Sequence, residues 1–166
     1  MKQRRIYDLK PIALEAVPQA IEKADRYRVL NDPQLAELIC LQVLAVDPDN
    51  QHNLRTLILS ISDQFANPGS RVSSLRALCY VTRLESEYER AYYRGLLAER
   101  EARASLGRTH RDAYGGFCEA MSWYEKADEL SPSNNDDARL RYNTCARTLE
   151  HEELEPPTRE PELPLE

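Results

Sequence analysis

The chain has 166 residues, 42% of them hydrophobic and 30% charged, which is the composition of a single folded domain with a sizeable core. Its formal net charge of −6 lacks the basic balance of a nucleic-acid-binding fold, so we expect no nucleic-acid partner. No apolar run approaches the roughly 20 residues that cross a bilayer, and residues 1–10 lack the apolar stretch of a secretory signal. We therefore expect a cytoplasmic protein that does not enter a membrane.

Residue usage predicts an all-α fold. The chain has only 5 Gly, it lacks runs of Val, Thr and Ile with period two, and Ala, Leu, Arg and Glu dominate. Helix start and stop signals recur along the chain and divide it into about seven helices. We expect one helical domain over residues 17–151, preceded by a lead-in, residues 1–16, and followed by a tail, residues 152–166.

The first two helices have clear boundaries. Pro18 suits the first turn of a helix, and Asn31 tolerates the left-handed backbone conformation that ends one. Asp32 is placed to cap a second helix, which should end at the segment "DPDN", residues 47–50. The same segment offers caps for a third helix.

The third helix shows the clearest apolar periodicity of the chain. Its large apolar side chains share one helical face, which must be buried: Leu54, Leu57, Ile58, Ile61 and Phe65. The segment "ANPGS" then interrupts the helical pattern. A fourth helix is marked by an apolar stripe that consists of Val72, Leu75, Leu78 and Cys79.

Three more helices and a tail complete the chain. Ser86 and Glu89 have the spacing of a capping box, which predicts a long fifth helix that ends near Leu106. The sixth helix contains "AYGGFCEAMSWYEKADEL", residues 113–130, and the seventh runs from about 136 to 149. The tail holds six Glu, one Arg and four Pro, which predicts a disordered or extended segment.

No residue pattern calls for catalysis, a cofactor or a metal. The cysteines are far apart in sequence and fall on apolar helical stripes, so we expect free, buried thiols at Cys40, Cys79, Cys118 and Cys145. The histidines lie near helix ends, and no nucleophile-elbow, zinc-protease or phosphate-loop pattern is present. Glu99 and Arg103 are one helical turn apart, which favours a partly buried structural ion pair over a catalytic carboxylate.

Two segments of the chain align without a gap. Residues 33–50, "PQLAELICLQVLAVDPDN", match residues 117–134, "FCEAMSWYEKADELSPSN". The alignment pairs Ala36 with Ala120, Cys40 with Tyr124, Val43 with Ala127, Val46 with Leu130 and Pro48 with Pro132. It assigns the aromatic cluster of the second segment, including Phe117 and Trp123, to helix packing rather than to ligand stacking. For the Gly115-Gly116 pair we expect a close contact or a kink.

The aligned pattern resembles the tetratricopeptide repeat family, in which the second helix of each hairpin carries small and aromatic residues at these spacings and a Pro just past its end. Ala24 and Tyr27 match the small and aromatic positions of the first helix, so residues 17–50 form a nearly regular unit. The resemblance implies an α-solenoid of about three helix hairpins and a C-terminal capping helix. Pro48 and Pro132 are farther apart than two regular units allow, which implies an irregular, extended middle repeat.

The resemblance also implies where a partner would bind, because the first helix of each solenoid hairpin lines the concave surface. On the faces opposite the expected core stripes, the candidate residues are Arg28, Arg55, Leu59, Arg90, Tyr93, Arg94, Leu97, Arg139, Asn143 and Arg147. Arginine pairs bidentately with carboxylates, and apolar groups outside the core stripe would be exposed. We therefore expect a non-catalytic interaction scaffold for a protein or peptide, with an acidic segment as a candidate ligand.

Two alternatives to this function stay open. The chain could be a structural subunit of a homo-oligomer or larger complex whose own copies fill the groove, or the Glu99 region could belong to an enzyme or a small-ligand binder. A further hypothesis concerns the tail, whose formal charge of −5 would allow it to fold onto the arginines and compete with partners.

Overall fold

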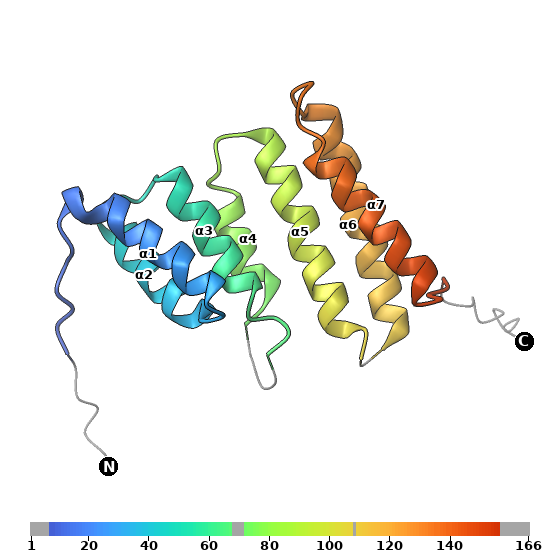
Figure 1. Ribbon diagram of the computed structural model, residues 1–166, viewed down its shortest axis with the longest axis horizontal. Coiled ribbons are helices and arrows are strands. Elements are labelled where there is room, and N and C mark those ends of the chain that lie inside the picture. Colours follow the sequence, from blue (N-terminus) through green and yellow to red (C-terminus); the bar gives the residue numbers. More distant parts are fainter. Residues whose placement is uncertain (1–6, 68–71, 108, 157–166) are drawn as a thin grey trace, which may run out of the picture.

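The computed structural model describes residues 7–67, 72–107 and 109–156, and Figure 1 shows its helices side by side in chain order. A short 3-10 helix, Leu14–Ala16, precedes seven α-helices in these ranges. They are α1 (Val17–Val29), α2 (Pro33–Val46), α3 (Gln51–Ser62), α4 (Ser74–Val81), α5 (Glu87–Ser105), α6 (His110–Leu130) and α7 (Asp137–His151). The described residues contain no strand, so the all-α prediction is confirmed.

The helix boundaries follow the capping signals in the sequence. Asn31 has a φ of 61°, the left-handed conformation expected after α1. The Asp32 side chain accepts a hydrogen bond from the Leu35 backbone N–H at 3.2 Å, and Ser86 does the same for Glu89 at 3.3 Å. These caps satisfy N–H groups that the first turns of α2 and α5 would otherwise leave without a partner.

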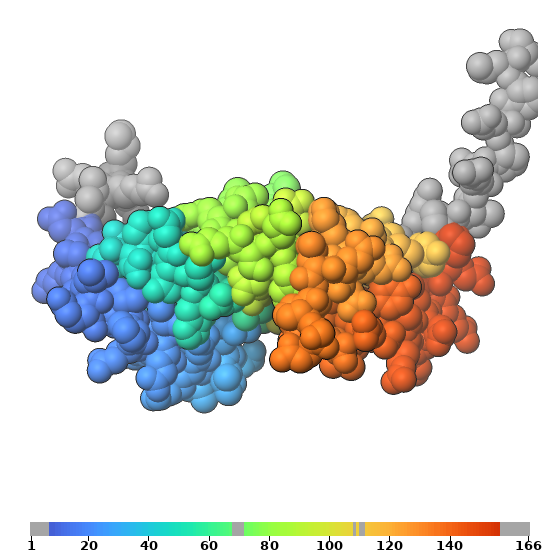
Figure 2. Space-filling model, turned by 90° about the horizontal axis from the view of Figure 1, so that it is seen from above, coloured from blue at the N-terminus to red at the C-terminus, as the bar shows by residue number. Residues whose placement is uncertain are grey.

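The helices pack in a solenoid-like row. Each contacts its neighbours in the sequence, and α3 also contacts α1 and α5, which are the first helices of the adjoining hairpins. In the space-filling view of Figure 2 the colours succeed one another along the molecule, as this packing requires. The buried apolar residues form two main clusters, one centred on α1–α4 and the other on α5–α7. Helix α5 belongs to both, because Leu97 joins the first cluster while Ala91 and Ala102 join the second.

Small residues bring α5 and α6 close together. A Cβ added at Gly95 would lie 2.8 Å from Cε1 of Tyr124, and one added at Gly116 would lie 2.8 Å from Cβ of Ala102. Phe117 and Tyr124 are fully buried, so the packing role predicted for them is confirmed. The same holds for the aligned positions Ala36, Ala120, Cys40, Val43 and Ala127.

The apolar stripe predicted for the fourth helix matches its buried face only in part, because Val72 and Leu78 pack against the core and the other two residues do not. Leu75 is 72% exposed and Cys79 is exposed, while the core receives Ala77 and Val81. Apolar residues surround most of this short helix, "SLRALCYV", so periodicity alone could not choose the face that contacts α3 and α5. The four thiols are free, but only Cys40 and Cys145 are fully buried; Cys118 is half-buried. The expectation of a buried thiol is thus wrong for Cys79.

The packed part of the chain extends beyond α7. Leu154, which the sequence places in the tail, is 7% exposed and belongs to the α5–α7 cluster. The rest of the tail prediction concerns mainly residues 157–166, which lie outside the described residues, as do residues 1–6 of the lead-in. Across the described ranges, no helix combines the length and apolarity required to cross a membrane.

Candidate partner-binding surfaces

Six of the predicted partner-binding residues are arginines, and two of them bridge successive hairpins. The Nε of Arg28 donates to Oδ2 of Asp63 at 2.8 Å, which joins α1 to the end of α3. The Nη1 of Arg55 donates to Oε1 of Glu89 at 2.9 Å, which joins α3 to α5. Because each guanidinium already has a carboxylate partner inside the fold, neither offers a free charge to an acidic ligand.

Further bonds link the same first helices. Arg100 donates to the Asp63 carboxylate and, at 2.5 Å, to Oγ of Ser62, so Asp63 ties both α1 and α5 to the end of α3. The hydroxyl of Thr56 donates to Oδ1 of Asp25 at 3.0 Å, which adds a second link between α3 and α1. Arg28 and Arg55 therefore lie in a charge-compensated network that holds successive hairpins together.

The prediction that Leu97 is exposed is wrong. Its side chain is 1% exposed and sits in the α1–α4 cluster. Tyr93 packs against the same cluster, where burial raises the pKa of its hydroxyl to about 12, and Leu59 is half-buried. The reason is that α5 is an internal helix of the row, with one face on α6 and a second on α3 and α4. Only one buried face was expected for each helix, so the second face of α5, which carries Leu97, was expected to be exposed to solvent.

The remaining predicted residues do not converge on one groove. Arg90 donates to two backbone carbonyls in the turn before α5, at 2.5 and 3.0 Å. Arg139 forms ion pairs with Asp128 of α6 at 3.1 Å and with Asp136 at 2.8 Å. With Asn143 it lines a separate cavity of about 290 Å³ between α6 and α7. Arg147 is exposed, and no ion pair to it is found among the described residues.

Glu99 forms the ion pair with Arg103 that was expected from the sequence, and its carboxylate has two further hydrogen-bond donors. Its carboxylate accepts from Nε of Arg103 at 3.0 Å, from the Tyr124 hydroxyl at 2.7 Å and from Nη1 of Arg141 at 3.5 Å. Glu99 is 1% exposed, and burial raises the pKa of Tyr124 well above its usual value, with the Glu99 charge adding to the effect. Burial, followed by the same charge, raises the pKa of the Cys145 thiol to about 12. A carboxylate with this many donors is suited to joining α5, α6 and α7.

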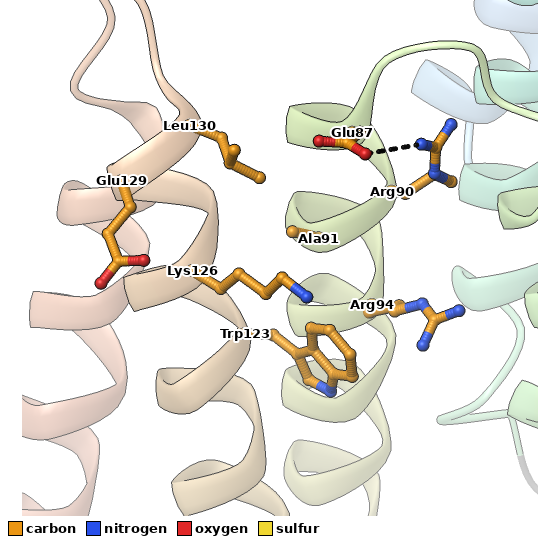
Figure 3. A pocket seen from close by; sticks show the side chains of 8 residues that line it. All are labelled: Glu87, Arg90, Ala91, Arg94, Trp123, Lys126, Glu129 and Leu130. Atoms are coloured by element: carbon orange, nitrogen blue, oxygen red, sulfur yellow. Dashed lines mark ion pairs between the residues drawn. The ribbon is translucent and has the colours of Figure 1, made fainter.

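Arg94 differs from the other predicted arginines. Its guanidinium carbon lies 4.8 Å from the centre of the Trp123 ring, and the Lys126 ammonium lies 5.5 Å from the same ring. Neither cation has an ion-pair partner in the part of the chain that the structure describes. Figure 3 shows Lys126 reaching from α6 toward α5, while Arg90 is held by Glu87. Two cations without an ion pair among the described residues thus flank an indole in a cavity of about 280 Å³, whose lining also includes Glu87 and Glu129.

This cavity is the first of three that adjoin along the seam between α5 and α6. The middle cavity, of about 120 Å³, shares Arg94 and Trp123 with the first. The third, of about 540 Å³, shares Ala98, Glu101 and Glu119 with the middle one. We call the three together the α5–α6 groove, defined by the facing sides of residues 87–105 and 112–130.

The sequence interpretation missed this groove because it treated Trp123 as a packing residue. Trp123 is only half-buried and lines the first two cavities. One signal was available, since Lys126 follows Trp123 by three residues and so shares its helical face. The position of Arg94 over the indole depends on the register of α5 against α6, which the sequence does not provide.

Among the residues that the structure describes, no group of three or more His, Cys, Asp or Glu side chains is placed to hold a metal ion. Glu99, the buried carboxylate considered for catalysis, lines none of the four cavities described above. Comparisons of the chain with protein-family models, with curated proteins and with solved structures find no match in any of the three.

Proposed function

We propose that the chain is a non-catalytic, tetratricopeptide-like interaction scaffold that binds a segment of a partner protein in the α5–α6 groove. The observation that supports this proposal is the placement of Arg94 and Lys126, which flank Trp123 in an open cavity without a carboxylate partner in the described chain. A partner carboxylate would neutralise the two cations, and an adjacent apolar side chain would cover the indole. Partly exposed Trp and Arg residues are also the residue types that dominate binding energies at protein interfaces.

Two of the predicted concave arginines serve the scaffold rather than the partner in this proposal. Arg28 and Arg55 are engaged by Asp63 and Glu89, so a ligand would have to break an existing ion pair to use either. Arg94 requires no such exchange. Glu99 has a structural role as well, because its carboxylate already accepts bonds from three side chains.

A structural subunit is the second candidate, favoured by apolar side chains at both ends of the row. Val29 and Leu38 are exposed on the first hairpin, and Leu140 is exposed on α7. Solenoid ends usually carry polar capping faces, so these residues favour end-to-end association of copies. Sedimentation velocity over a wide concentration range tests this candidate, and a monomer at every concentration would contradict it.

The main proposal is tested by affinity capture from a cell lysate, followed by identification and purification of each captured protein. Direct binding is then measured with the wild type, with Arg94→Glu/Lys126→Glu and with Arg147→Glu. Arg147 is the matched control, because it is an exposed arginine without an ion pair in the described residues. We expect the double variant to lose the purified partner and Arg147→Glu to keep it. Equal binding by all three proteins would contradict binding in the α5–α6 groove. A wild type that captures no specific protein would contradict the scaffold function.

A further inference from the structure

We propose that the α5–α6 groove recognises a helix of defined charge polarity, with an acidic N-terminal end and a basic C-terminal end, supplied by a partner protein. The inference rests on the proposed function and deepens it, because it specifies the form, direction and charge of the bound segment.

The charge of the groove changes sign along its length. The first cavity, at one end, is lined by three cations, Arg90, Arg94 and Lys126, and by two carboxylates, Glu87 and Glu129, so its lining carries a net positive charge. The third cavity is lined by Glu101, Asp112 and Glu119, which are exposed and have no ion pair in the described residues. Asp112 only accepts a hydrogen bond, from the Thr109 hydroxyl at 2.6 Å. At 1.5 Å per residue along α6, Lys126 is about 10.5 Å from Glu119 and about 21 Å from Asp112.

A helix of about four turns spans these separations, with its first turn at the cations, its middle near Glu119 and its last turn near Asp112. Carboxylates are favoured near the N-terminus of a helix and basic side chains near its C-terminus, because they complement the helix dipole. A helix that carries acidic residues first and basic residues last therefore satisfies its own dipole and both ends of the groove. It would run parallel to α5, which passes from Arg94 to Glu101, and antiparallel to α6.

Among the described helices, α4 leaves part of the groove uncovered because it is short. Helix α4 has 8 residues, whereas α5 has 19 and α6 has 21. Ser74 and Leu78 of α4 line the middle cavity, but no α4 residue lines the third cavity. The end of the α5–α6 hairpin that carries the third cavity therefore extends past α4.

Gly115 gives an independent indication of a close approach from outside. A Cβ added at Gly116 would collide with Ala102, so that glycine is explained by the contact between α5 and α6. A Cβ added at Gly115 would meet nothing within 4 Å, although glycine disfavours the interior of a helix. Gly115 lines the third cavity, where a bound helix could pack its backbone close to the groove floor.

The test uses two synthetic helical peptides of about 15 residues, stapled to the same helicity. Both have the same composition and the same leucine stripe, and neither contains tryptophan. The first carries two glutamates in its N-terminal turn and two lysines in its C-terminal turn, and the second has these positions exchanged. Because the chain has 1 Trp, the fluorescence of Trp123 reports binding directly at the groove. Titrations are made at low and at high salt.

We expect the first peptide to bind roughly fivefold more tightly than the second at low salt, the effect of a few exposed charge pairs, with the difference shrinking at high salt. Arg94→Glu/Lys126→Glu should remove the preference. Adding Glu101→Lys and Glu119→Lys, which inverts both ends, should make the second peptide the tighter ligand. Gly115→Leu should weaken both peptides, while a control leucine at Glu125, outside the groove cavities, should leave them unchanged. Circular dichroism verifies that every variant is folded.

Four results would overturn the proposal. The two peptides could bind equally, or the preference could survive inversion of the groove charges. Removal of residues 157–166 could open the groove to both peptides alike, which would make the acidic tail its occupant. Self-association that is lost in Arg94→Glu/Lys126→Glu, with neither peptide bound, would assign the groove to a second copy. If the captured partner is lost in Arg94→Glu/Lys126→Glu while the peptides show no preference, the scaffold function is supported and only the charge polarity is contradicted.

Discussion

The close contact between α5 and α6 at Gly95 predicts that a larger residue at this position lowers the stability of the fold. A methyl group at this position would lie 2.8 and 2.9 Å from two ring carbons of Tyr124 and 3.2 Å from the backbone oxygen of Ala120. Tyr124 cannot swing away freely, because it is fully buried and its hydroxyl donates to Glu99 at 2.7 Å. Gly95→Ala must therefore push the two helices apart.

The expected loss follows from two opposing effects. Overpacking a well-packed core costs about 1–3 kcal/mol, while replacing an interior helical glycine by alanine contributes up to about 1 kcal/mol of stability. We expect Gly95→Ala to lower the free energy of unfolding by about 1–2 kcal/mol, with a fall in Tm of roughly 2–4 °C per kcal/mol for a chain of this size. Urea unfolding followed by circular dichroism measures the change, and thermal melting checks its sign.

Gly115→Ala is the matched control within the same hairpin. Its Cβ would meet nothing within 4 Å, so only the propensity effect acts and the variant should be more stable by up to about 1 kcal/mol. Gly116→Ala collides with Ala102, and Ala102→Gly should restore part of the lost stability in the double variant. A Gly95→Ala protein as stable as the wild type, or shifts of the same sign for Gly95→Ala and Gly115→Ala, would refute the close-packing argument.

Three further predictions concern charge and ionisation. Arg55→Glu and Glu89→Arg should each destabilise the fold by about 0.2–1 kcal/mol at low salt, and the double exchange should recover most of the loss in a double-mutant cycle. Glu99→Leu leaves the buried Tyr124 hydroxyl without its acceptor and should lower the free energy of unfolding by about 1–3 kcal/mol, part of which Glu99→Leu/Tyr124→Phe should recover. Burial raises the thiol pKa of Cys40 and of Cys145 from 9.0 to about 12, so the folded state binds more protons than the unfolded state between these values. Stability should therefore be complete below pH 9 and fall as the pH rises toward about 12, and replacing both thiols by alanine should flatten that part of the unfolding profile.

The sequence contained the information for the helices because local chemistry decides where they begin and end. Asn31 supplies the left-handed residue after α1, and Asp32 and Ser86 supply side-chain caps, so each signal acts within a few residues of itself. The apolar face of α3 was equally clear, since Leu54 and its apolar neighbours share it and are buried, although α3 also buries polar residues such as Asn53 and Ser60, which the apolar pattern does not report. These features need no knowledge of the tertiary arrangement.

The binding surface could not be predicted in the same way, because it depends on how helices distant in sequence are placed. Leu97 reads as a surface residue until α3 and α4 are brought against α5. Arg55 reads as a free cation until Glu89 is found 2.9 Å away on another helix. Trp123 reads as a core residue until it is found half-buried beside Arg94, where it lines two cavities. Each error has the same origin, which is a contact between elements that the periodicity of one helix does not report.

The double membership of α5 in the two apolar clusters has a consequence for cooperativity. Leu97 belongs to the α1–α4 cluster and Ala91 and Ala102 to the α5–α7 cluster, so neither half of the row can lose its structure without exposing one side of the same helix. In a linear array of helices, a helix that packs against both halves couples their local unfolding. The two halves then unfold together in one transition. Leu97→Ala weakens only one side of this coupling. Native-state hydrogen exchange of that variant should show the amides of α1–α4 opening independently, while those of α6 and α7 still exchange only through global unfolding.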